Sequence, residues 1–248
     1  MIASEILNTT LQAGTMLLES GAEVYRVEDT MVRMAKSFPK VQQAVSYVTV
    51  TGIMLSITVD NQTYTKIARV YAVGRNLHQI NEINSLSRAC KSMELPVKEV
   101  QRKLDGFKKE KPYSFWVQNL FGAIGACGFA LFFGGNIYDI AAVFFVGLMI
   151  RLLEHYLIFL RLNPFFINLI LAMFAAIVTS LISHFVFKSE LDIMLLSTLM
   201  LLVPGLALTN AIRDTLSSDY LSGLARLMHV VLVASALALG AGLVLYFL

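Results

Sequence analysis

The sequence is short of charge, and what charge it has is nearly balanced. Only 15% of its 248 residues are Asp, Glu, Lys or Arg, whereas 56% are hydrophobic. A soluble domain carries about 25% charged residues, so the composition favours a chain that lies partly in lipid. The formal net charge of +3 is too small to indicate a nucleic-acid partner.

Cysteines and catalytic motifs are equally scarce. Cys90 falls in a polar helical pattern and Cys127 in an apolar run, so neither indicates a disulfide or a metal ligand. The hydrolase signatures G-x-S-x-G and H-E-x-x-H are absent, and the four histidines are scattered. A nucleotide-binding G-x-x-x-x-G-K-[ST] loop is also missing, so any transport would be coupled to an ion gradient. We therefore expect no enzymatic activity, no cofactor and no metal.

The charged residues are distributed unevenly along the chain. Of the 37 charged residues (20 basic and 17 acidic), 26 lie in residues 1–112 and 11 in residues 113–248. This split predicts two domains in different solvents: a cytoplasmic domain over 1–112 and a transmembrane domain over 113–248. The first ten residues include Glu5 and no basic segment, so no secretory signal is expected and the first domain should stay in the cytoplasm.

The first domain mixes helical and strand patterns. Apolar residues at helical spacing predict helices over 1–18, from 23 to Pro39, over 76–92, and a short last helix beginning at Pro96. Ser20 and Glu23 match a capping box for the second of these helices. Residues 44–59 and 63–70 are rich in Val, Ile, Thr and Tyr and are broken by turn-forming residues, which predicts three strands. The pattern is typical of a small α+β domain.

The second domain alternates long apolar runs with short polar joints, at about 113–133, 137–160, 164–187, 191–212 and 221–248. Crossing ~30 Å of hydrocarbon takes about 20 helical residues, so the runs predict a membrane all-α bundle of about five transmembrane helices. Basic residues gather at one set of helix ends: Lys108, Lys109, Lys111, Arg151, Arg161, Arg213 and Arg226. The positive-inside rule then predicts a multi-pass plasma-membrane protein with a cytoplasmic N-terminus and an external C-terminus.

One predicted span carries three ionisable residues on one face. Arg151, Glu154 and His155 stand at i, i+3 and i+4 in the run 137–160. Ionisable groups at membrane depth are costly and usually line a polar path, so a role in proton or ion coupling is one interpretation. The other is that the three side chains extend from the cytoplasmic interface into the head groups.

The predicted fourth span contains Pro204 and Gly205 in its interior. Pro removes a backbone donor, and transporters use broken helices of this kind near a substrate. A simple packing kink is the alternative. A polar edge with Asn210, Arg213 and Asp214 follows. Arg213 is a candidate anchor for a substrate carboxylate, and the alternative is an ion pair with Asp214 or a nearby acid.

Two further groups of residues have mainly structural interpretations. Tyr25, Arg26, Glu28 and Asp29 form a polar cluster on an amphipathic helix, where spacing alone suggests a surface ion pair. Small residues of the first span form a stripe that indicates helix packing, with a nearby polar pair that could add a lining: Gly122, Gly125, Ala126 and Gly128, with Gln118 and Asn119.

Two long segments resemble the threonine/serine exporter family. They are residues 19–30 (ESGAEVYRVEDT) and residues 203–214 (VPGLALTNAIRD), supported by Ser222-Gly223, and the resemblance runs through nearly the whole chain. It implies a cytoplasmic domain followed by five spans. Some members continue into a second, smaller helical bundle that this sequence lacks, so the chain resembles the larger subunit of the split form. Split pairs are associated with export of dicarboxylates such as succinate, and fused members with threonine and serine.

The resemblance places Arg26, Glu28, Asn210, Arg213 and Asp214 within the family's two motifs. We therefore predict a subunit of a secondary transporter that exports small carboxylate-bearing metabolites, either threonine and serine or a dicarboxylate. Its expected partners are the lipid bilayer, the small-molecule substrate and a second, smaller membrane subunit, with homo-oligomerisation left open. The alternative is a non-transporting membrane scaffold or sensor whose cytoplasmic domain binds a ligand.

Overall fold

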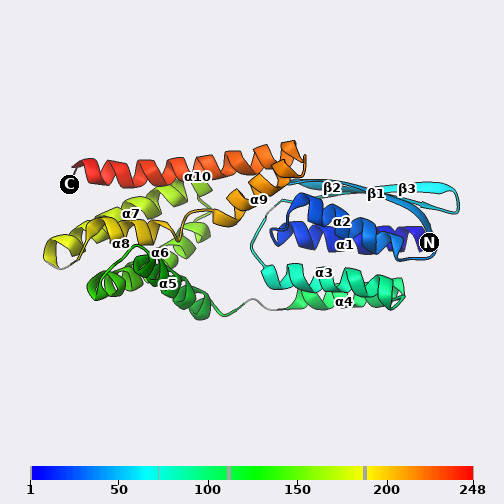
Figure 1. The fold of residues 1–248 in the computed structure, drawn as a ribbon, viewed down its shortest axis with the longest axis horizontal. Coiled ribbons are helices and arrows are strands. Elements are labelled where there is room, and N and C mark those ends of the chain that lie inside the picture. Colours follow the sequence, from blue (N-terminus) through cyan, green and yellow to red (C-terminus); the bar gives the residue numbers. More distant parts are fainter. Residues whose placement is uncertain (1, 72, 111–112, 187–188, 248) are drawn as a thin grey trace. The chain divides into compact units, whose positions relative to one another are not determined.

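The computed structural model describes residues 2–71, 73–110, 113–186 and 189–247 (Figure 1). The chain forms two compact units. The N-terminal unit comprises Met1–Lys111 with Leu206–Met228, and the membrane unit comprises Pro112–Gly205 with His229–Leu248. Several predicted features fall outside the described residues: the domain boundary at 112, the span ends at 187 and 248, and the charges of Lys111 and Lys188.

The N-terminal unit surrounds a three-stranded antiparallel sheet with helices. Its elements are α1 (Ile2–Glu19), α2 (Val24–Lys36), β1 (Val41–Thr49), β2 (Gly52–Val59), β3 (Gln62–Arg69), α3 (Leu77–Ser92), α4 (Val97–Lys109), α9 (Gly205–Leu216) and the start of α10 (Tyr220–Phe247). The predicted strands are confirmed. Asp60 and Asn61 both have positive φ, which suits the tight turn that joins β2 to β3.

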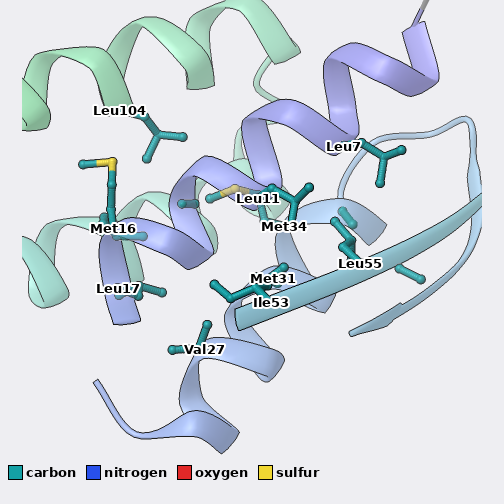
Figure 2. Close-up of a cluster of buried hydrophobic side chains, with 14 of the residues drawn as sticks. Leu7, Leu11, Met16, Leu17, Val27, Met31, Met34, Ile53, Leu55 and Leu104 are labelled. Carbon is teal, nitrogen blue, oxygen red and sulfur yellow. The ribbon is translucent and has the colours of Figure 1, made fainter. Parts of the chain in front are cut away.

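The core of this unit follows the periodicity of the sequence. Alternate residues of β2, from Ile53 to Val59, are buried on one face of the sheet. Figure 2 shows Ile53 and Leu55 meeting apolar side chains of α1 and α2, and Met16 of α1 extending toward Leu104 of α4. A side chain at Gly14 would collide with the sulfur of Met31, so glycine lets α1 and α2 approach closely there.

The membrane unit contains helices of the length and apolarity needed to cross a bilayer. They are α5 (Phe115–Phe132), α6 (Ile137–Phe159), α7 (Pro164–Phe185) and α10, with mean hydropathies of 1.5, 1.8, 2.5 and 2.4. Four predicted spans are therefore confirmed, with ends within two residues of those expected. Gly147 of α6 lies against Ala126 and Ala123 of α5, so small residues bring these two helices together.

The predicted fourth span, 191–212, is not one helix. Helix α8 (Leu191–Leu199) has 9 residues, residues 200–204 are not helical, and α9 begins at Gly205. The bonds from Leu201 N to Thr198 O and from Leu202 N to Leu199 O tighten the end of α8 before Pro204, which has no N–H to continue the helix. Of the two interpretations of the predicted fourth span, the broken helix is the one observed, because Pro204 separates two helices rather than kinking one.

Candidate functional site

Residues 20–23, in the first of the two segments that resemble the exporter family, form a tight turn between α1 and α2. Ala22 N donates to Leu17 O and Gly21 N donates to Leu18 O, the paired bonds of a Schellman motif that ends α1. Gly21 has φ +90, and a Cβ there would lie 2.8 Å from the carbonyl oxygen of Gly74. Both facts require glycine at this position.

The predicted capping box of Ser20 and Glu23 is wrong. The Ser20 hydroxyl shares its one proton between Met16 O and Gln79 Oε1, each 2.6 Å away, and Glu23 occupies the N-cap position of α2 without a side-chain cap. The spacing matched the motif, but the left-handed turn at Gly21 places Ser20 at the end of α1.

Residues from α9 replace the missing cap of α2. Asp214 Oδ1 accepts from the Val24 backbone N–H at 3.0 Å, and Asn210 Nδ2 donates to Gly21 O at 2.8 Å. From α10, Arg226 donates to Ala22 O at 2.9 Å. A carboxylate at a helix N-terminus satisfies orphan donors and favours the helix dipole. The turn between α1 and α2 is therefore held by side chains about 190 residues further along the chain.

The carboxylate of Glu23 forms ion pairs with two arginines. Arg26 places Nε 2.9 Å from Glu23 Oε2 and Nη2 3.2 Å from Oε1, and Arg213 Nη1 lies 2.6 Å from the same Oε1. The Glu23 side chain is buried, whereas that of Arg213 is 57% exposed. Guanidinium groups bind carboxylates through parallel hydrogen bonds, and Arg26 and Arg213 together hold the carboxylate of Glu23.

Asp214 and Arg226 form the buried half of the same arrangement. Arg226 Nε lies 2.9 Å from Asp214 Oδ2, outside hydrogen-bonding geometry, and the side chains are 8% and 0% exposed. Burial raises the pKa of Asp214, and the charge of Arg226 and the Val24 N–H oppose that rise. The carboxylate of Asp219 adds a smaller raising effect. We name the six side chains of both halves the motif cluster: Glu23, Arg26, Asn210, Arg213, Asp214 and Arg226.

Comparison with known proteins assigns the chain to a family. The model of the putative threonine/serine exporter family matches residues 8–248. The chain belongs to the threonine/serine exporter family. It is 25% identical over 232 residues to the probable succinate transporter subunit YjjP of Escherichia coli (strain K12), covering 93% of this chain and 90% of that protein. It is 24% identical over 233 residues to the protein of the same name in Klebsiella aerogenes, covering 93% and 89%. No solved structure matches the chain.

The two segments that resemble this exporter family meet in the N-terminal unit. Glu23 and Arg26 come from residues 19–30, and Asn210, Arg213 and Asp214 from residues 203–214. Pro204 and Gly205, also predicted to bind substrate, lie in the membrane unit, where Pro204 precedes α9 and Gly205 is its first residue. Glu23 and Arg226 were missed as site residues, because a pairing across about 190 residues leaves no local spacing signal.

The remaining residues of the first segment lie around the cluster. Glu28 Oε1 accepts from Val48 N at 2.8 Å, and burial raises the pKa of Glu28. Asp29 pairs with Arg33 rather than with Arg26, and Tyr25 is exposed. The predicted pair of Arg26 and Asp29 is thus replaced by two other pairs.

In the membrane unit, Arg151, Glu154 and His155 do lie together on α6. Arg151 Nη1 is 2.5 Å from Glu154 Oε2, and His155 Nδ1 is 3.3 Å from Arg151 O. The His155 ring meets the edge of Phe115 at a centroid distance of 4.7 Å. Among the small residues of α5, Gly122 lies against the Arg151 side chain, whereas Gly125 and Gly128 have no neighbour within 4 Å of an added Cβ. Only part of the predicted stripe therefore packs closely.

Proposed function

We propose that this protein is a subunit of a secondary transporter that exports small carboxylate-bearing metabolites from the cytoplasm together with a second, smaller membrane subunit. Family membership and relatives named as transporter subunits support this proposal. The observation that carries it is the pair of guanidinium groups on Glu23, because the same geometry suits the carboxylate of a substrate.

We infer that a substrate carboxylate exchanges with Glu23 on Arg213. Arg213 is more than half exposed, so a solute can approach it while Arg26 still holds Glu23. Asn210 and Asp214 then act as positioning residues, since they fix the turn that carries Glu23. On α6, Arg151, Glu154 and His155 are the proposed path for a coupling proton or ion.

The test is efflux from cells loaded with threonine, serine and succinate, with the chain expressed alone and together with a candidate for the proposed smaller membrane subunit. We expect faster loss of one solute only in the paired cells. Arg213→Ala should lower that loss, whereas Arg33→Ala, which breaks an exposed pair in the same unit, should not. Unchanged export and half-saturation in Arg213→Ala would refute the role of Arg213.

A second variant separates exchange from a structural role. Glu23→Gln removes the competing charge but keeps a hydrogen-bond acceptor for both arginines. If the substrate competes with Glu23, the half-saturating concentration on the cytoplasmic side should fall. A rise in that concentration would mean that Glu23 only stabilises the turn.

We further propose a cytoplasmic N-terminus and an external C-terminus. This orientation needs an odd number of crossings, and the four long helices among the described residues supply an even number. The proposal therefore assigns one more crossing to α8 and the non-helical residues 200–204, which belong to the membrane unit. A reporter that is active only outside the cell, fused at the C-terminus, should be active. Activity of a reporter that works only inside would show an even number of crossings.

A further inference from the structure

Asn119 is an unusual residue for its place in α5. Its side chain is fully buried, and neither Nδ2 nor Oδ1 has a hydrogen-bond partner among the described residues. Helix α5 is one of the four helices suited to crossing the membrane. An unpaired amide in such surroundings lowers the stability of the fold, and a leucine of similar size would avoid that cost.

The contacts between α5 and α6 place Asn119 beside the ionisable residues of α6. A Cβ on Gly122 would lie 3.2 Å from Arg151 Nε, and Phe115 meets His155. Asn119 stands three residues before Gly122 and four after Phe115, so it occupies the same face of α5 between these two contacts. Residues three apart on a helix are separated by about 5–6 Å, so one small solute is long enough to reach both Asn119 and the side chain packed on Gly122.

Arg151 is only partly satisfied. Its Nη1 pairs with Glu154, but its Nε is buried and has no hydrogen-bond partner in the described chain. Arg151 Nε lies against Gly122, one helical turn from Asn119, and the Asn119 amide offers a further donor, Nδ2, and an acceptor, Oδ1. We call Asn119, Arg151 and Glu154 the α5–α6 polar group.

We propose that the α5–α6 polar group binds a small anionic solute that carries a hydrogen-bond donor next to its carboxylate. The carboxylate accepts from Arg151 Nε and Asn119 Nδ2, the donor satisfies Asn119 Oδ1, and Glu154 holds the Arg151 guanidinium through Nη1. A fully ionised dicarboxylate without a hydroxyl or ammonium group has acceptors only, and it leaves Oδ1 unpaired. This proposal deepens the proposed function, on which it rests for the direction of transport but not for binding.

The test uses two solutes that differ by one hydroxyl group, malate and succinate, both fully ionised. The purified full-length chain is heated with increasing concentrations of each solute, and the unfolding temperature is recorded, since a bound solute stabilises the folded state. Malate should stabilise the wild type at concentrations on the order of tenfold lower than succinate, the effect of one hydrogen bond to a buried group. Equal effects of the two solutes, or no effect of either, would overturn the proposal.

Variants of Asn119 complete the test. Asn119→Leu should raise the unfolding temperature of the solute-free protein and abolish the preference for malate, and Asn119→Ala should abolish the same preference without adding bulk. Ser180→Ala is the matched control, because Ser180 Oγ is also buried without a partner but lies on α7. A malate preference that survives both Asn119 variants would refute the site. If the preference for malate depends on Asn119 but the chain exports nothing, the binding site stands and the proposed exporter function is refuted.

Discussion

Breaking the buried ion pair of Asp214 and Arg226 should loosen the whole N-terminal unit. Asp214→Asn keeps the shape of the side chain and an acceptor for the Val24 N–H, but it leaves the guanidinium of Arg226 buried without a countercharge. Removing one partner of a buried pair costs about 3–5 kcal/mol. Since a domain is stable by only about 5–15 kcal/mol, this single change should consume a large part of that stability.

The thiol of Cys90 offers an assay confined to this unit. Cys90 is fully buried on α3 in the same core cluster as Val24, and burial raises the pKa of its thiol to about 11, so it reacts only after the unit opens. In a Cys127→Ala background, which removes the membrane unit's cysteine, labelling by a thiol reagent then reports the open fraction. Asp214→Asn should speed labelling by about 10²- to 10⁴-fold, because each 1.36 kcal/mol of the cost of about 3–5 kcal/mol is tenfold.

Two further variants decide whether the pair itself is responsible. Asp214→Asn combined with Arg226→Met removes both charges and should label far more slowly than Asp214→Asn alone. Asp29→Asn, which breaks an exposed pair on α2, should change the rate by less than about tenfold. The reasoning fails if Asp214→Asn labels no faster than Asp29→Asn, or if the double variant is as fast as the single one.

Three other variants test separate parts of the argument. Gly21→Ala should destabilise the N-terminal unit by about 1–3 kcal/mol and lower its unfolding temperature, because φ is +90 at Gly21 and the Gly74 carbonyl obstructs a Cβ. An unchanged unfolding temperature would contradict the described conformation of the turn. Burial raises the pKa of Glu28, as it does for Asp214 and Asp219, so the wild type should lose stability as pH rises above 4.5. Glu28→Gln should make that loss smaller by the share of Glu28, and parallel pH profiles of the two proteins would show that Glu28 does not contribute to it. Gly122→Val should disturb the packing of Arg151 and weaken malate binding in the heating assay used for Asn119. Gly125→Val should not, since no described atom lies within 4 Å of a Cβ added at Gly125. Equal effects of the two variants would refute the proposed contact between α5 and α6.

Where a feature depends on local periodicity, the sequence predicts it well. The alternation from Ile53 to Val59 predicts β2, and the apolar runs predict α5, α6, α7 and α10, because both patterns reflect the solvent around each element. Pro204 marked the break between α8 and α9, but composition did not show that α9 belongs with the N-terminal unit. Helix α9 is amphipathic enough to suit either solvent, so only its tertiary contacts determine to which unit it belongs.

The motif cluster shows why site residues are harder to predict. Glu23 looked like a local cap because the spacing from Ser20 fits, and nothing nearby in the sequence indicates Arg213 as its partner. The resemblance drew attention to Arg26, Asn210 and Asp214 as members of two separate motifs. The structure adds that Arg26 pairs with Glu23, whereas Asn210 and Asp214 bond to the backbone of the turn before α2. Only the geometry assigned these individual contacts.

Hydrogen-bond satisfaction separates the structural residues from the candidates for ligand binding. Asp214 and Arg226 are buried and bonded to the turn before α2, so their exchange with a solute would open the unit. Arg213 holds the same turn from an exposed position, where a solute carboxylate can replace Glu23 at little cost in burial. Asn119 differs from all three, since its buried amide bonds to no described residue and lowers stability unless a ligand pairs with it. Replacing a residue that lowers stability in the solute-free protein should raise the stability of the fold and weaken solute binding. These two opposite effects cannot arise from a purely structural role.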